Sequence, residues 1–300
     1  MTGRPAGPGG WEPGGFLVID RVAWTRRGEP AGDREHPTAG AWSDVSGPLA
    51  TLVADALRSA DRPVLVGVAG AVAAGKSTLV GHLAEQVTSG AGRPTVATVG
   101  TDGFLLPNAV LAERGLLARK GFPETYDHDR FADTLRRLAA GEAHVNVPVY
   151  SHEIFDVTGE LRRLDRTDVV IFEGINALAV PQRAGSPAGD RTASPYTLGV
   201  FVDAEESDLR AWFSERFVSF IDAARSDATS FYAQWIDLTL AEARALAGGV
   251  WDTINQPNLV EHILPTRERA DVIVHKGHDH TVAAIALAPR SGDPRWRRPG

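Results

Sequence analysis

The sequence predicts an α/β fold in which a parallel sheet is covered by helices on both faces. Two observations carry this prediction. Apolar runs of strand length alternate with longer segments of helical periodicity, and one of those runs leads directly into a glycine-rich loop. Strands that alternate with helices form parallel sheets. At 300 residues, the chain is long enough for one large domain of this kind or two modest ones.

The first element expected is a helix at residues 44–59. Leu49, Leu52, Val53 and Ala56 recur there at the spacing that places side chains on one face of a helix. This face is apolar, so we expect the helix to pack against the sheet.

Strand-like and helical segments then alternate as far as residue 274. The continuous apolar run VLVGVA at residues 64–69 is typical of a strand that is covered on both faces. Further strands are expected at residues 95–99, 169–172, 198–202 and 271–274. Further helices are expected at residues 76–87, 129–140, 205–221 and 239–254.

The remaining segments divide the chain into three regions. Residues 1–43 are rich in glycine and proline, so we expect a flexible segment that is disordered over residues 1–15. The more apolar residues 16–24 are able to dock on the body of the protein. Residues 44–289 form the expected domain, interrupted by a long mobile loop at residues 181–195, and residues 290–300 form a basic, solvated tail.

The composition excludes several classes of protein. The chain has no cysteine, which excludes a disulfide scaffold, an iron–sulfur cluster and a cysteine nucleophile. Its nine histidines are scattered without an H-E-x-x-H pair, so we expect no transition-metal site. A net charge of −7 argues against a protein that coats nucleic acid. No apolar run has the length of a membrane span, and no secretory signal opens the sequence. We therefore expect a cytoplasmic protein without a nucleic-acid or membrane partner.

Residues 70–77 read GAVAAGKS, a full match to the phosphate-loop motif G-x-x-x-x-G-K-[ST]. Gly70 and Gly75 allow the tight backbone path whose N–H groups surround phosphates, Lys76 brings a cation, and Ser77 offers a hydroxyl to Mg²⁺. A glycine-rich turn can match by chance, but the buried strand before the loop and the helix after it favour a nucleotide site. The fold expected is therefore of the P-loop NTPase type. The residues expected to bind ATP are Gly70, Ala71, Val72, Ala73, Ala74, Gly75, Lys76, Ser77 and Thr78.

Two acidic residues follow predicted strands, at the edge where α/β sheets bind ligands. Asp102, in TVGTDGF, is a candidate base for a substrate hydroxyl or a metal ligand acting through water. The alternative is that Asp102–Gly103 is only a turn. Glu173, in VVIFEG, is a candidate to lie near Mg²⁺, and the alternative is a solvated glutamate at the end of a strand.

One arginine interrupts an apolar stripe of the helix expected at residues 205–221. Leu209, Phe213, Arg216 and Phe220 share one helical face. An arginine there is costly unless it is paired or faces an anionic ligand. The alternative is an arginine whose aliphatic stem covers part of the core.

Six segments together closely resemble the bacterial type I pantothenate kinases. They are GVAGAVAAGKST, TDGFLLPN, ERGLLARKGFPETYD, PVYSHEIFDV, IFEGINAL and NLVEHILPTRERADVI, in this order within residues 64–275. GFPETYD and ILPTRERA distinguish this family from the related uridine kinases and phosphoribulokinases. The resemblance implies a Mg²⁺-dependent kinase that uses ATP to phosphorylate pantothenate at its primary hydroxyl, the first step of coenzyme A biosynthesis. It also implies a homodimer and feedback inhibition by coenzyme A.

The resemblance also implies roles for individual residues. Asp102 matches the family's catalytic base, Lys76 the phosphate-loop lysine, and Arg216 the arginine that meets the transferring phosphoryl group. Three further residues match those that bind pantothenate: Tyr150, His152 and Asn255. By default four aromatic residues are core residues, but the resemblance places them in the pocket shared by pantothenate and coenzyme A: Phe155, Phe220, Phe231 and Tyr232.

Two residues depart from the family's pattern. Phe213, at a substrate-binding position, replaces a tyrosine, and Gly81 replaces a basic residue that helps to bind the phosphates of the inhibitor. The missing hydroxyl favours an alternative function, a P-loop kinase of another small alcohol that is pantothenate-like, uridine-like or a specialised metabolite. A nucleotide-binding regulator without turnover is the third hypothesis, and the candidate base Asp102 speaks against it, because such a switch has no use for one.

Overall fold

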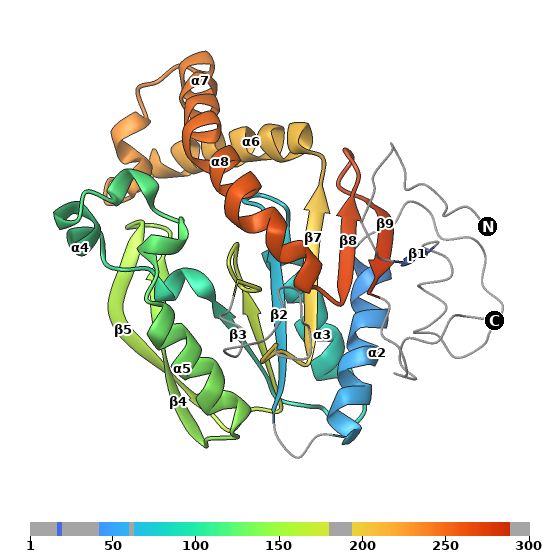
Figure 1. The fold of residues 1–300 in the computed structure, drawn as a ribbon. Helices are drawn as coiled ribbons and strands as arrows, with labels where there is room; N and C mark the ends of the chain where they lie inside the picture. Colours follow the sequence, from blue (N-terminus) through green and yellow to red (C-terminus); the bar gives the residue numbers. More distant parts are fainter. Residues whose placement is uncertain (1–16, 20–41, 60–62, 180–193, 289–300) are drawn as a thin grey trace.

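A seven-stranded sheet forms the centre of the protein (Figure 1). The computed structural model describes residues 17–19, 42–59, 63–179 and 194–288. The strands lie in the order β1-β9-β8-β7-β2-β6-β3. Their bounds are β1 (Leu17–Ile19), β2 (Val64–Gly70), β3 (Val96–Gly100), β6 (Val169–Glu173), β7 (Leu198–Ala204), β8 (Val272–Lys276) and β9 (Val282–Leu287).

Five of these strands are parallel, as the sequence predicts. β2 pairs with β6 on one side and with β7 on the other, β3 extends the sheet beyond β6, and β8 extends it beyond β7. All seven residues of β2 and of β7 are buried, which explains their continuous apolar runs.

Two antiparallel strands that the sequence did not predict complete one edge of the sheet. β9 follows β8 after a short turn and pairs with it antiparallel, and β1 pairs with β9. A short connection joins antiparallel strands without a helix, so the alternation of strands and helices gives no sign of β9. β1 lies in the segment expected to be flexible, within the apolar residues 16–24 that were expected to be able to dock.

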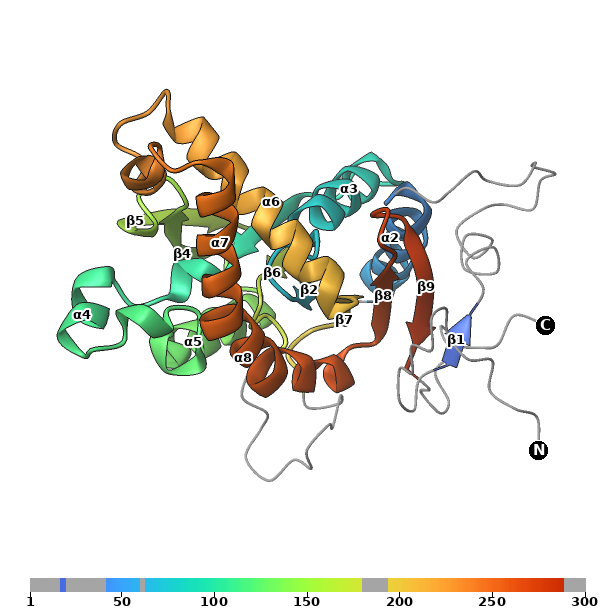
Figure 2. The same cartoon turned by 90° about the horizontal axis from the view of Figure 1, so that it is seen from above.

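The five predicted helices are present. They are α2 (Ser43–Ser59), α3 (Lys76–Ser89), α5 (His128–Ala139), α6 (Glu206–Ala224) and α7 (Leu240–Val250). Figure 2 shows α2 and α3 on one face of the sheet, with α5 and the helical turns that follow α7 on the other. The predicted covering of both faces is confirmed.

The helix predicted at residues 239–254 changes character before its expected end. It is α-helical to Val250 and continues as a π-helical turn, η7 (Trp251–Asn255). A short α-helical stretch, α8 (Gln256–Asn258), and a second π-helical turn, η8 (Leu259–Ile263), follow. Pro257 lies between the two π turns and has no N–H to donate to the preceding turn, which accounts for the irregular hydrogen bonding around it.

A hairpin that the sequence did not predict stands beside the sheet (Figure 1). It consists of β4 (His144–Ser151) and β5 (Asp156–Asp165), paired antiparallel. Nearly all of β5 is exposed or half-buried, so it lacks the apolar run that signals a strand. The remaining elements are short: η2 (Thr101–Phe104), α4 (Asn108–Glu113), η3 (Leu117–Arg119), η4 (Pro123–Thr125), η6 (Phe231–Trp235) and η9 (Leu264–Arg269).

Several expectations fall on residues outside the described ones. These are the disordered residues 1–15, most of the loop at residues 181–195 and the tail at residues 290–300. The division of the chain at residues 43 and 289 stays a prediction. Among the described residues, no helix has the length and apolar character needed to cross a membrane.

Candidate active site

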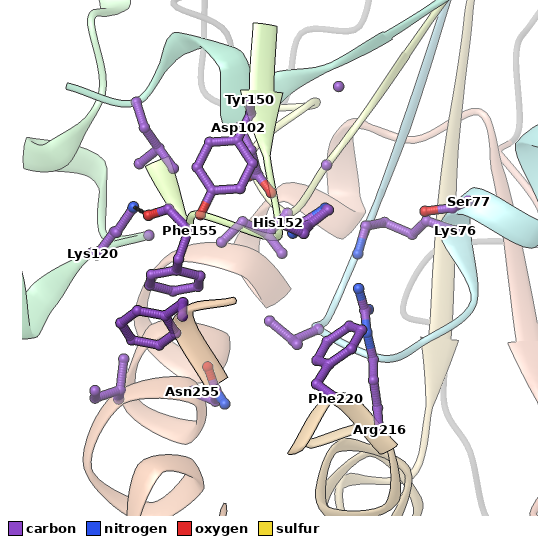
Figure 3. A pocket seen from close by; sticks show the side chains of 18 of the residues that line it. Lys76, Ser77, Asp102, Lys120, Tyr150, His152, Phe155, Arg216, Phe220 and Asn255 are labelled. Atoms are coloured by element: carbon purple, nitrogen blue, oxygen red, sulfur yellow. Dashed lines mark hydrogen bonds between the residues drawn. The ribbon is translucent and has the colours of Figure 1, made fainter. Parts of the chain in front are cut away.

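A cavity of about 630 Å³ opens at the carboxyl ends of β2, β3 and β6 (Figure 3). It brings together residues that the sequence singled out one by one. The predicted site residues that line it are Val72, Lys76, Ser77, Asp102, Tyr150, His152, Glu173, Phe213, Arg216 and Asn255. The other predicted residues of the phosphate loop do not line it: Gly70, Ala71, Ala73, Ala74, Gly75 and Thr78.

The phosphate loop joins β2 to α3. Gly75 has a φ of 94°, and a Cβ added to it would lie 2.9 Å from the ring of Trp42. Ala73 also has a left-handed φ, of 64°. These conformations turn the chain sharply, so that α3 begins at Lys76 with its amino end beside the cavity. The end of a helix that carries free N–H groups favours bound phosphate.

The side chain of Lys76 folds back over the phosphate loop that precedes it. Its Nζ donates a hydrogen bond to the carbonyl oxygen of Ala71 at 2.8 Å, and the side chain is buried. Burial lowers the pKa of the ammonium, the carboxylates of Glu173 and Asp102 oppose this shift, and Arg216 adds to it. An anion at this place would offset the cost of burying the charge.

Ser77 and Glu173 place two oxygen-bearing side chains, a hydroxyl and a carboxylate, side by side. The hydroxyl of Ser77 donates to Oε1 of Glu173 at 3.1 Å, and Glu173 is the last residue of β6, as predicted. Among the described residues, no group of three or more histidine, aspartate or glutamate side chains is placed to hold a metal ion by itself. A hydroxyl and a carboxylate fit Mg²⁺, which usually completes its ligand shell with water and substrate phosphates.

Asp102 lies in η2, two residues beyond the end of β3. Its Oδ1 accepts a hydrogen bond from the hydroxyl of Tyr126 at 3.4 Å. The glycine that follows it permits a close approach, because a Cβ at Gly103 would lie 2.5 Å from the carbonyl oxygen of Pro148 in β4. The segment therefore packs against β4 and against Tyr126, and the carboxylate of Asp102 lines the cavity. This placement favours a chemical role for Asp102 over that of a residue in a solvated turn.

Arg216 reaches the cavity from α6, and Figure 3 shows its side chain extending toward Lys76. Its guanidinium lies 5.1 Å from the centre of the Phe220 ring. No carboxylate among the described residues forms an ion pair with it. Two cations that converge on one cavity are suited to an anionic ligand with several charges.

The hairpin supplies polar groups that the sequence placed only through the resemblance. Tyr150 lies in β4 just after a shift in its register with β5, and its ring lies 5.1 Å from that of His152 in an edge-to-face arrangement. Burial and the charge of Asp102 raise the pKa of Tyr150, so its phenol stays a hydrogen-bond donor at neutral pH.

Lys120 is a cavity residue that the sequence analysis missed. Its Nζ donates to Oδ1 of Asn108 at 2.7 Å and to the carbonyl of Phe155, and it lies 4.3 Å from the centre of the Phe155 ring. Burial lowers its pKa to about 8, against the opposing charges of Asp156 and Asp102. Lys120 directly precedes the segment GFPETYD, so the motif did mark its neighbourhood.

Aromatic rings form part of the wall of the cavity. Phe155 and Phe231 stack with centres 4.6 Å apart, and Phe220 and Tyr232 lie 4.9 Å apart. Phe213 packs against Phe217 and Trp251 instead, and its ring lines the cavity without a hydroxyl. The expectation that these aromatic residues surround a pocket agrees with their placement.

Asn255 lies in the π turn η7 and lines the cavity. Its Nδ2 is buried and has no hydrogen-bond partner among the described residues. A buried donor left unpaired costs about 1–3 kcal/mol. A ligand with an acceptor atom at this place would remove that cost.

A cluster beside the phosphate loop has no signal in the sequence, because its members are far apart along the chain. The ammonium of Lys276 lies 4.0 Å from the centre of the Trp212 ring and 5.4 Å from that of Trp42. The ring of His280 stacks on Trp212 at 4.4 Å. Trp212 is buried and Trp42 is half-buried, so the cluster packs beside the phosphate loop, where a Cβ added to Gly75 would lie 2.9 Å from the ring of Trp42.

Comparisons with known proteins agree with this geometry. Residues 65–211 match the phosphoribulokinase/uridine kinase family. Over 227 residues the chain is 46% identical to a pantothenate kinase of Sorangium cellulosum, covering 75% of this chain and 73% of that protein. It is 42% identical over 225 residues to a pantothenate kinase of Cutibacterium acnes, covering 74% and 69%.

Solved structures with low sequence identity share the fold. A putative fructose transport system kinase from Silicibacter has a TM-score of 0.53 at 23% identity, covering 74% of this chain and 94% of that one. The YGR205w protein has a TM-score of 0.57 at 12% identity, covering 84% and 100%. The fold class predicted from the sequence is confirmed.

Proposed function

The chain belongs to the pantothenate kinase family, and we infer from this that it phosphorylates pantothenate at its primary hydroxyl with ATP as the donor. The product is 4′-phosphopantothenate, and the reaction opens coenzyme A biosynthesis. One observation gives the strongest support to a mechanism of phosphoryl transfer: Lys76, Asp102 and Arg216 line one cavity at the carboxyl ends of the strands.

We propose that Asp102 is the general base. As the oxygen of the primary hydroxyl forms its bond to the γ-phosphorus, the O–H bond breaks and its proton passes to the carboxylate. The bond between the γ-phosphorus and the oxygen that bridges it to the β-phosphorus breaks at the same time, and ADP leaves. Lys76 and Arg216 stabilise the charge that spreads over the transferring group.

The hydroxyl of Ser77 and the carboxylate of Glu173 are the residues that would hold Mg²⁺. When bound, this ion neutralises part of the charge of the phosphates.

The substrate side combines polar groups with an apolar wall. Tyr150 and His152 are placed to hydrogen-bond the polar groups of pantothenate, and the unpaired amide of Asn255 to donate to an acceptor on its chain. The ammonium of Lys120 lies 5.0 Å from the centre of the Tyr150 ring and 4.3 Å from that of Phe155, and it suits the carboxylate of pantothenate. We further propose that coenzyme A inhibits the enzyme, that the enzyme is a cytoplasmic homodimer, and that none of its partners is a nucleic acid or a membrane.

A second function has one observation in its favour. Phe213 offers no hydroxyl to the substrate, which would suit a small alcohol with fewer polar groups. An assay of ADP release distinguishes the candidates when it is run with pantothenate, pantothenate analogues, uridine and glycerate. We expect pantothenate to give the highest kcat/KM. A higher value for another alcohol would establish the second function, and ADP release with none of them would point to a regulator without turnover.

A further inference from the structure

A buried tyrosine stands beside the candidate base. The hydroxyl of Tyr126 donates to Oδ1 of Asp102 at 3.4 Å, and no hydrogen bond from the described residues reaches Oδ2. We propose that Tyr126 is a positioning residue, which holds the carboxylate of Asp102 by one oxygen so that the other accepts the proton of the substrate. This inference rests on the proposed role of Asp102.

The backbone fixes the two side chains relative to each other. Leu105 and Tyr126 form an antiparallel bridge between their segments. The N–H of Leu106 donates to the carbonyl oxygen of Thr125 at 2.8 Å, and the N–H of Asp127 donates to that of Phe104 at 2.8 Å. These bonds flank the Leu105–Tyr126 bridge, and the N–H of Leu105 donates to the carbonyl oxygen of Asp102 at 3.1 Å, so the main chain ties together the two segments that carry the hydroxyl and the carboxylate.

The tyrosine remains a donor wherever the enzyme is assayed. Its side chain is 6% exposed, and burial together with the charge of Asp102 raises its pKa well above the usual value. A hydrogen bond donated to a carboxylate favours the ionised form, which is the form that accepts a proton.

Other charged and titratable groups also face this carboxylate. Lys76 on α3, Lys120 after η3 and Tyr150 on β4 all interact with its charge. Glu173 on β6 and Arg216 on α6 line the same cavity. All five are retained when the hydroxyl of Tyr126 is removed, so the substitution isolates one contact.

The test compares Tyr126→Phe with Tyr196→Phe. Tyr196 is a matched control, because it is equally buried at 6% exposure, packs on Phe172 and does not line the cavity. For each variant, the rate of phosphoryl transfer is measured in a single turnover as a function of pH, with the KM of ATP and of pantothenate.

We expect Tyr126→Phe to lower the transfer rate about three- to tenfold, the range for one hydrogen bond, with both KM values within about twofold of wild type. The acidic limb of its pH profile should move to higher pH, because the ionised carboxylate has lost a donor. Tyr196→Phe should change neither rate nor profile. Equal rates and equal profiles for the two variants would overturn the inference.

Asp102→Asn separates the inference from the proposed function. If Tyr126 acts through the carboxylate, Tyr126→Phe should change the residual rate of the Asp102→Asn enzyme less than about twofold. A full further loss in that background would overturn the inference and leave the base intact. Wild-type rates in Asp102→Asn alone would overturn both. If Tyr126→Phe folds poorly, the midpoint of the acidic limb of its pH profile still tests the inference, because this midpoint does not depend on the amount of active enzyme.

Discussion

At the scale of the residue, the account depends most on the carboxylate of Asp102. Asp102→Ala should lower kcat by about two to four orders of magnitude, the usual worth of a general base, while ATP binds with nearly unchanged affinity. Steady-state kinetics and calorimetric titration with ATP measure the two quantities. Near-normal turnover in a folded variant would show that Asp102 serves only the turn in which it lies.

Arg216 tests whether the shape of a cation matters as well as its charge. Arg216→Lys keeps the charge but loses the planar fork that matches phosphate oxygens, so turnover should fall severely although binding of ATP persists. Lys76→Ala should abolish activity while the protein stays folded, and its turnover is the lower reference value for that of Arg216→Lys. If Arg216→Lys turns over like wild type, a simple point charge suffices and the proposed contact is wrong.

Lys120 predicts a pH dependence of substrate binding. Burial lowers its pKa to about 8, so the ammonium is charged at pH 7 and loses its proton as the pH rises through 8. The KM of pantothenate should therefore be low below pH 8 and rise above it. Lys120→Met should have a higher KM at pH 7 that changes little up to pH 9. If the KM of pantothenate changed with pH in the same way in wild type and in Lys120→Met, the proposed contact between Lys120 and the carboxylate of pantothenate would be wrong.

At the scale of the element, α3 carries a position that tests the proposed inhibition by coenzyme A. Gly81 lies on an exposed face of α3, and nothing lies within 4 Å of a Cβ added to it, so an arginine fits there. One charge–phosphate contact is worth about 1–3 kcal/mol. Gly81→Arg should therefore tighten inhibition by coenzyme A about five- to 150-fold and leave the KM of pantothenate almost unchanged.

Gly81→Ala is the control for this substitution. Both changes replace a glycine inside a helix and should stabilise it by up to about 1 kcal/mol, but only arginine adds a cation. Arg162 of β5 also lines the cavity and is a second source of positive charge there. Strong inhibition of the unmodified enzyme that Gly81→Arg leaves unchanged would refute the role given to this position.

Several of the elements that sequence reasoning recovered are ones whose burial determines their composition. β2 and β7 are buried along their whole length, and α5 has one apolar face, so their patterns are unambiguous. The hairpin strand β5 is mostly exposed and carries charges, and β9 follows a turn too short to suggest a new element. An apolar pattern cannot reveal a strand that is largely exposed, such as β5. The alternation of strands and helices cannot reveal a strand that follows its neighbour without an intervening helix, such as β9.

At the scale of the whole molecule, the site could be predicted only in part. The phosphate loop, Asp102 just beyond β3 and Glu173 at the end of β6 follow from local patterns, because strands of a parallel sheet bring their carboxyl ends together. Tyr150, His152 and Asn255 needed the resemblance. The packing of Lys276 between Trp42 and Trp212 joins three distant parts of the chain, and no local pattern encodes such a contact.

The central claim is that this cavity transfers phosphate to the primary hydroxyl of pantothenate, and the ³¹P NMR spectrum of the product tests it most directly. A phosphate on the primary hydroxyl is three bonds from two protons of a CH₂ group, whereas one on the secondary hydroxyl is three bonds from a single proton. With ATP, Mg²⁺ and pantothenate, we predict a new phosphomonoester signal coupled to two protons, formed by the wild-type enzyme and nearly absent with Asp102→Ala. A signal coupled to one proton, or no phosphomonoester at all, would contradict the account.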